Sequence, residues 1–146
     1  MHPLFGGVSE QRKAAKHRFD DARTLFDQNR WRGAMYLGGY SVECLLKTKL
    51  MLRHDCHNLR ELEEALQDAG LLAAGTTIYT HQLELLLRLA QGMDRLRQNQ
   101  SLWKLFNIAN LWMPAWRYNP DLSNREDAED FLEAVERVSH WIESNI

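Results

Sequence analysis

The sequence predicts an all-α fold, an up-and-down bundle of four main helices with one or two short extra helices. Apolar residues recur with the helical period along the whole chain. No run of four or more residues alternates strictly between apolar and polar types, and Val, Ile and Thr are scarce, which argues against strands. The 146 residues fit a single domain, 1–146, that can hold a core without disulfides.

The first half of the chain predicts three helices. Ser9 can cap the first, and Asn29, which tolerates left-handed backbone, ends it. The second runs from about Trp31 to Arg53 and is apolar around almost its whole circumference, so we expect it to be the buried centre. A short third helix over residues 59–66 ends at Gly70.

A loop of small residues follows over 70–80. Thr80 is expected to cap a fourth helix that reaches Ala90, and residues 102–109 carry the apolar spacing of a fifth. Pro114 and Pro120 then bracket a segment expected to be irregular, because proline lacks an amide donor and disfavours helix just before itself.

The last predicted helix opens with a capping-box pattern. Ser123 and Glu126 have the spacing at which each side chain satisfies a free amide near the other. The residues expected to face the core from this helix are Ala128, Phe131, Leu132, Val135, Val138 and Ile142.

Composition excludes several classes of protein. A net charge of −2, with 26% charged and 45% hydrophobic residues, is typical of a soluble globular chain and not of a disordered one. The apolar runs are far shorter than the ~20 residues of a membrane span, so no membrane association is expected. Residues 1–8 show no signal-peptide pattern, and two cysteines suit a reducing compartment, so we predict a cytoplasmic protein.

Charge is distributed unevenly along the chain. Residues 1–60 carry 11 basic and 6 acidic side chains, whereas residues 114–146 carry 3 and 8. These two segments can bind each other within a monomer or across a symmetric dimer, or the basic segment can meet a polyanion. Alternatively, both are ordinary solvated helix faces.

Glu43 is the most unusual charged residue, because it stands in the most apolar helix. With Lys47 it has the spacing of a helical ion pair. A carboxylate among such neighbours is expected to be at least partly buried and then needs a cation or several donors. It belongs either to a structural network or to the lining of a site.

Residues 112–120 form the most unusual segment, with three aromatic residues and Arg117 between two prolines. Trp116 and Tyr118 can anchor a protein interface, or they can stack on nucleobases while Arg117 meets a phosphate. A third interpretation is a hydrophobic loop that closes the end of the bundle.

Motifs for metal, cofactor or nucleophilic chemistry are weak. His54 and His57 have zinc-like spacing, but no second Cys/His pair follows at a suitable distance. The chain contains neither of the glycine-rich phosphate-binding patterns nor a G-x-S-x-G turn. We therefore expect no metal and no cofactor.

The stretch AAKHRFDDARTLFDQNRWRGAMYLGGYSVECLLKTK, residues 14–49, resembles the first two helices of HEPN domains (higher eukaryotes and prokaryotes nucleotide-binding). His81-x-Leu83, the segment 116–120 and Trp141-Ile142 are also similar to that family. The positions that carry the second-helix pattern are Ala34, Tyr36, Gly39, Tyr40, Glu43, Leu46 and Lys47.

The resemblance implies a symmetric homodimer, often encoded beside a nucleotidyltransferase with which it acts as toxin and antitoxin. Many HEPN proteins are metal-independent ribonucleases with an R-x4-6-H motif, in which a polar helix residue, here Glu43, supports the Arg and His. Arg117 matches the Arg, but Leu122, Ser123 and Asn124 stand where the His is expected. The expected acid/base partner is therefore missing, which makes ribonuclease activity doubtful.

Three functional hypotheses result. The first is a module that binds a nucleotide or RNA, or docks a nucleotidyltransferase partner, through a cleft lined by Glu43, Lys47, Trp116, Arg117 and Tyr118. The second is a ribonuclease toxin that uses Arg117. The third is an inert assembly protein that forms a homodimer.

Overall fold

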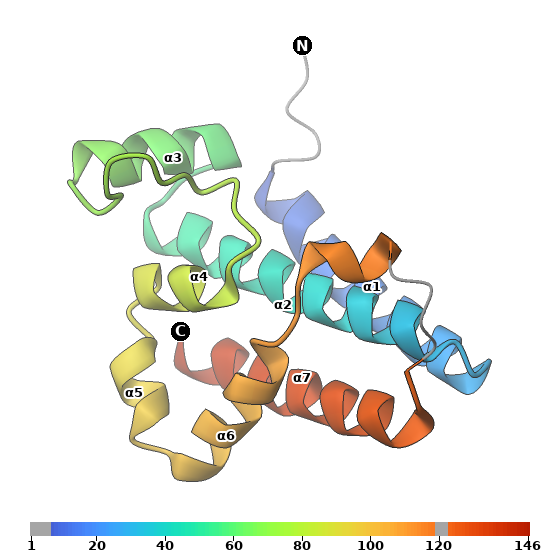
Figure 1. The fold of residues 1–146 in the computed structure, drawn as a ribbon. Coiled ribbons are helices and arrows are strands. Elements are labelled where there is room, and N and C mark those ends of the chain that lie inside the picture. Colours follow the sequence, from blue (N-terminus) through green and yellow to red (C-terminus); the bar gives the residue numbers. More distant parts are fainter. Residues whose placement is uncertain (1–6, 119–122) are drawn as a thin grey trace.

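The computed structural model describes residues 7–118 and 123–146, and within these ranges it contains seven α-helices and one 3₁₀ helix (Figure 1). The predicted all-α helical bundle is confirmed. Residues 1–6, part of the segment expected to carry no signal peptide, lie outside the described residues. So do Asn119, Pro120 and Leu122. The elements are α1 (Val8–Asp27), α2 (Trp31–Arg53), α3 (Leu59–Asp68), α4 (Leu83–Leu89), α5 (Met93–Arg97), α6 (Gln100–Ala109), η2 (Pro114–Tyr118) and α7 (Arg125–Asn145).

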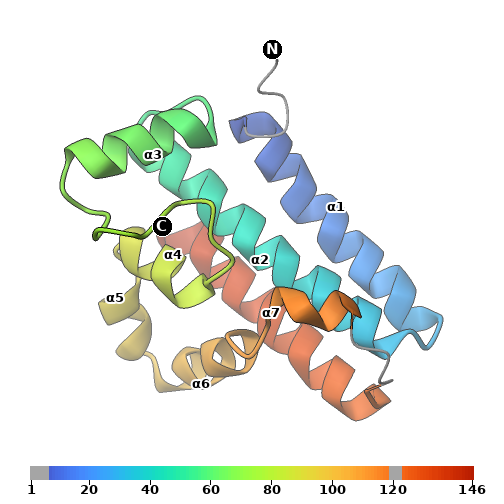
Figure 2. The ribbon, with the colours of Figure 1, turned by 45° about the horizontal axis from the view of Figure 1, so that its top comes forward.

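Helix α2 is the centre of the fold, as its apolar circumference predicted. It lies between α1 and α7 in both views (Figures 1 and 2) and also contacts α3, α4 and η2. Asn29, with a φ of 62°, turns the chain between α1 and α2, so these two helices run antiparallel. The stripe predicted to face the core from α7 is buried throughout.

Ion pairs join the basic first half of the chain to the acidic last helix. Arg23 of α1 pairs with Glu136 of α7. Lys49 of α2 pairs with Glu143, at 3.1 Å between Nζ and Oε2. The two oppositely charged parts therefore meet within one chain, although each of these exposed contacts contributes little to stability.

Two glycines allow other elements to approach the α2 backbone closely. A Cβ on Gly38 would come within 2.7 Å of a Leu132 methyl of α7, and a Cβ on Gly39 would overlap the indole ring of Trp112. The two glycines therefore serve the packing of α7 and Trp112 against the central helix.

Three predicted caps are wrong. The helix α1 begins one residue before Ser9, because Gly7, bridged to Asn58, already stands in extended backbone and serves as N-cap. Thr80 accepts a hydrogen bond from the Gln82 amide and forms a turn instead of the cap of α4. Asn124, not Ser123, caps α7 by accepting from the backbone amide of Asp127 at 2.7 Å.

Two short helical elements were not predicted. Helix α5, Met93–Arg97, has only five residues, too few to show a period. The segment after Pro114 was expected to be irregular, but it forms the 3₁₀ helix η2. Proline is well tolerated at the first position of a helix, where its missing amide would be unpaired in any case.

Candidate functional site

Glu43 lies in the buried middle of α2, with 3% of its surface exposed. Its Oε2 accepts from the Lys47 ammonium one turn later, at 2.9 Å from Nζ, and Lys47 is itself 5% exposed. A buried carboxylate is strongly destabilising unless a cation and further donors satisfy it. The predicted pair therefore exists, and it is an internal pair instead of a solvated one.

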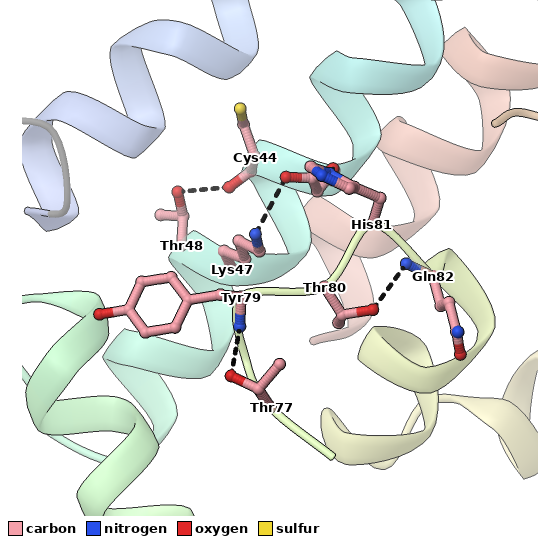
Figure 3. Close-up of polar contacts among 9 residues, drawn as sticks. Cys44, Lys47, Thr48, Thr77, Tyr79, Thr80, His81 and Gln82 are labelled. Carbon is pink, nitrogen blue, oxygen red and sulfur yellow. Dashed lines mark hydrogen bonds and ion pairs between the residues drawn. The ribbon is translucent and has the colours of Figure 1, made fainter. Parts of the chain in front are cut away.

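His81 supplies the second partner of this carboxylate. Its Nδ1 lies 2.7 Å from Glu43 Oε1, so each oxygen of the carboxylate has one partner. Lys47 and His81 approach this position from α2 and from the loop before α4 (Figure 3). The His81 side chain is 52% exposed, whereas that of Glu43 is 5% exposed. The pair thus joins the core to the surface.

The loop between α3 and α4 holds His81 in place through a second carboxylate. Glu63 of α3 accepts from the Ile78 amide at 2.8 Å and from the Thr77 hydroxyl at 2.5 Å. The Ile78 side chain is fully buried. These anchors, together with the bond from the Tyr79 amide to Thr77, position the chain just before His81 (Figure 3).

An aromatic cluster lies beside the Glu43–His81 pair. Trp112 is edge-on to the His81 ring, with centroids 6.1 Å apart, and is tilted against Tyr36 at 6.0 Å. Tyr40 completes the cluster at 6.5 Å from Trp112. The indole Nε1 donates to the Tyr36 carbonyl at 2.9 Å, which fixes the orientation of the ring. We call Tyr36, Tyr40 and Trp112 the ring cluster.

Arg117 and Tyr118 lie exposed at the end of η2. The guanidinium carbon of Arg117 is 4.8 Å from the centroid of the Tyr118 ring. The phenols of Tyr118 and Tyr36 raise the pKa of Arg117 above its ordinary value, so its charge is permanent. The arginine is therefore adjacent to the ring cluster through Tyr36.

The Trp116 side chain points away from Arg117 and Tyr118 and toward α7. Its ring contacts Phe131 of α7 edge-on, with centroids 5.2 Å apart, and the guanidinium of Arg32 lies 5.0 Å from its centroid. Trp116 is partly buried by these contacts. It anchors η2 to the bundle, with Arg32 covering the ring.

Four of the five residues predicted for the site form two groups, and the fifth, Trp116, packs separately against Phe131. Glu43 and Lys47 are buried together, Arg117 and Tyr118 are exposed together, and the ring cluster lies next to both groups. In the described part of the chain, the carboxylate of Glu43 pairs with the Lys47 ammonium and the His81 imidazole, not with Arg117.

His81 is the main residue that the sequence argument did not assign to the site. It stands in a segment that is similar to HEPN domains, but nothing in the local pattern links it to Glu43, which lies 38 positions earlier. Tyr36 and Tyr40 could have been found from their spacing of four, which places both on one face of a helix.

The described hollows of the molecule lie away from the predicted site. One of about 810 Å³ follows α7 beside α6, and another of about 440 Å³ opens between α1 and α7; neither is lined by the five predicted residues. Within the described residues, no group of three or more His, Cys, Asp or Glu side chains is arranged to hold a metal ion.

The protein is an all-α bundle with a buried acid, Glu43, on its central helix and an exposed arginine, Arg117, in an aromatic segment. The model of the HEPN domain family matches residues 8–145, nearly the whole chain, and the chain belongs to that family. No curated protein and no solved structure matches the sequence. None of the described helices has the length and apolar character needed to cross a bilayer.

Proposed function

We propose that this HEPN domain binds a nucleotide or an RNA segment at the surface formed by the exposed Arg117 and Tyr118 and the half-buried Tyr36. Membership of the HEPN family supports a nucleotide- or RNA-related module in general. The observation that carries the particular site is the Arg117 guanidinium beside two phenol rings. A permanent cation attracts a phosphate, and aromatic faces stack on nucleobases, so one small surface offers both interactions.

Glu43 and Lys47 contribute to this proposal indirectly. Both side chains are too deeply buried to touch a ligand, but their carboxylate and ammonium hold His81 against the ring cluster. Trp116 acts in a similar way, since its contact with Phe131 fixes the path of η2 and therefore the place of Arg117.

The experiment is fluorescence anisotropy of a labelled single-stranded RNA at low salt, with ATP and AMP as competitors. Replacing Arg117 by Ala should weaken binding about tenfold, and replacing Tyr118 by Ala should cost about 1–3 kcal/mol of binding free energy per stacked base. The matched control is Arg60→Ala, because Arg60 is also an exposed arginine, on α3, and is weakly paired with Glu64.

Absence of binding to RNA, ATP and AMP alike would remove the proposal. An equal loss in Arg60→Ala and Arg117→Ala would reduce it to general attraction between a cation and a polyanion.

Ribonuclease activity is a second candidate function, which the bond between Glu43 and His81 favours. In such a reaction the RNA 2′-oxygen attacks the adjacent phosphorus and the bond to the 5′-oxygen breaks. The proton of the 2′-hydroxyl passes to the imidazole and then to the departing 5′-oxygen. Incubated RNA should give fragments that disappear in both His81→Ala and Arg117→Ala, and RNA that stays intact would eliminate this candidate.

We also propose a protein partner, either a second copy of the chain or a nucleotidyltransferase in a two-component toxin–antitoxin system. Leu111 and Met113 are 64% and 50% exposed beside the proposed site, which supports a surface that a partner covers there. Cys44 and Cys56 are free thiols, compatible with action in a reducing cytoplasm. Sedimentation at micromolar concentration should give twice the 17.1 kDa of one chain, and a monomer would contradict the homodimer.

A further inference from the structure

Arginine side chains gather around one hollow at the corner between α4 and α5. The hollow has a volume of about 610 Å³ and is lined by Arg88, Gln91, Met93, Asp94, Arg95 and Arg97. None of these residues belongs to the surface proposed around Arg117, and α5 (yellow) lies apart from η2 (orange) in both views (Figures 1 and 2). A hollow of this size suits a small molecule. The α4–α5 corner is therefore a candidate binding site of its own.

The corner is built by a tight reversal of the chain. Gln91, with a φ of 59°, turns the chain between α4 and α5. A Cβ on Gly92 would come within 2.7 Å of a Leu87 methyl, so the turn packs directly against α4. Met93 and Leu96 are buried and fix α5 on the bundle. This reversal brings the arginine in the last turn of α4 to the same hollow as the arginines of α5.

Arg95 and Arg97 are held in place by neutral groups. The Nη2 of Arg95 donates to the side-chain oxygen of Asn145 at 3.5 Å. The guanidinium carbon of Arg97 lies 5.2 Å from the centroid of the Trp103 ring. A neutral oxygen or an aromatic face orients a guanidinium without cancelling its charge. Both cations are therefore available to an anion in the hollow.

The α4–α5 corner also has more positive than negative charge. Arg53, at the end of α2, donates from Nη2 to Oε1 of the lining residue Gln91 at 2.5 Å, which is again a neutral partner. Arg88 is neutralised by Glu84, at 3.1 Å between Nη2 and Oε1. The lining contains one carboxylate, that of Asp94, for which no ion pair is found among the described residues. Three guanidinium charges with neutral partners against this one carboxylate leave a surplus of two positive charges.

We propose that the α4–α5 corner binds the dianionic phosphate group of a small molecule, either free inorganic phosphate or a phosphate monoester. A phosphate monoester carries about two negative charges near neutral pH, which match the surplus, and presents three acceptor oxygens. The planar N–H donors of guanidinium groups fit these oxygens. A phosphodiester has only one charge and matches the corner less well. This second site does not depend on the nucleotide- or RNA-binding function proposed for Arg117.

The test uses phosphorus NMR line broadening to measure the affinity of three small probes, at pH 8 and at low, constant ionic strength. The probes are inorganic phosphate, methyl phosphate and dimethyl phosphate, none of which has a base that could stack on aromatic rings. The two dianions should bind about tenfold more tightly than dimethyl phosphate, which carries one charge. A factor of this size corresponds roughly to one charge-assisted hydrogen bond.

Arg95→Gln and Arg97→Gln should each weaken the binding of methyl phosphate about tenfold. Both side chains are exposed, so neither change should unfold the protein, and circular dichroism checks this. The matched control is Arg60→Gln, an exposed arginine of α3, which should keep the wild-type affinity. Arg117→Gln tells the two sites apart, because it removes the cation of the other surface and leaves the α4–α5 corner intact.

Binding of both dianions would support the proposal, and binding of inorganic phosphate alone would support it with the free anion as the ligand. Three results would overturn it: no broadening of any probe, equal affinity for methyl and dimethyl phosphate, or equal losses in Arg60→Gln and Arg95→Gln. Binding that is lost only in Arg117→Gln would also overturn it. Binding of RNA is measured separately, so this proposal and the proposed function can fail independently.

Discussion

The indole of Trp112 lies directly against the backbone of Gly39, where any side chain would overlap it. From this position its Nε1 reaches the Tyr36 carbonyl and its edge meets His81. The glycine on the central helix is therefore what allows the ring cluster to form next to the Glu43–His81 pair. Several measurable consequences depend on this arrangement.

Replacing Gly39 by Ala should destabilise the protein by about 1–3 kcal/mol, the usual cost of overfilling a packed core. The displaced indole would also lose its hydrogen bond to Tyr36. Urea unfolding measures the change. Gly33→Ala is the control, because its Cβ would meet only a Leu25 methyl at 3.2 Å and alanine favours helix. Equal losses of stability in the two variants would contradict the close approach of Trp112.

Replacing Lys47 by Met should destabilise the protein by about 3–5 kcal/mol, because Glu43 would remain buried without its cation. The double variant Glu43→Gln with Lys47→Met should recover much of this loss, since it removes the buried charge. Arg88→Met breaks the exposed pair with Glu84 and should cost less than about 1 kcal/mol. A Lys47→Met variant as stable as Arg88→Met would show that the pair is solvated.

Burial, together with the smaller effect of the negative charge of Glu43, raises the pKa of the Cys44 thiol to about 12. In the native protein Cys44 should resist iodoacetamide at pH 8, and it should react readily once urea unfolds the chain. Modification of native Cys44 at the unfolded rate would refute its burial.

The raised pKa of Cys44 also makes the stability of the protein depend on pH in the alkaline range. The unfolded thiol ionises near 9 and the folded one near 12, so the contribution is complete below pH 9 and is lost as pH rises toward 12. Urea unfolding between pH 8 and 10.5 should show stability falling less steeply in Cys44→Ala than in the wild type. Parallel pH profiles for the two proteins would contradict this.

Asn124→Ala should lower stability by about 1 kcal/mol, because its side chain satisfies the Asp127 amide at the start of α7. Ser123→Ala, one residue earlier, should have almost no effect. Thermal unfolding of the two variants under identical conditions gives the comparison. The reverse order would restore Ser123 as the cap.

The long helices were predictable, whereas their caps were not. The helix over Trp31–Arg53 is predicted by a continuous apolar pattern, and such a pattern suits the buried position that α2 takes in the fold. Ser9, Thr80 and Ser123 all have the chemistry of caps, but a neighbouring residue took that place in each case. Capping preferences differ by about 1 kcal/mol or less among suitable residues, so small tertiary contacts decide between them.

For the candidate site, the burial of Glu43 and its pairing with Lys47 could be read from the local pattern, because both residues lie on one helix four positions apart. The approach of His81 could not, since it depends on where an irregular loop crosses α2. The direction of Trp116, toward Phe131 and away from Arg117, likewise depends on the packing of η2 against α7.

The amino-acid sequence by itself determined the all-α class, the central helix, the inward stripe of α7 and the presence of an acid where an apolar residue would be ordinary. These properties arise from interactions between residues three or four positions apart, which the pattern of side chains records directly. The tertiary structure alone decided that His81 completes the Glu43 carboxylate and that Trp112 lies between His81 and Tyr36. Contacts of that kind join residues far apart along the chain, and the helices and anchored loops must pack before those residues can meet.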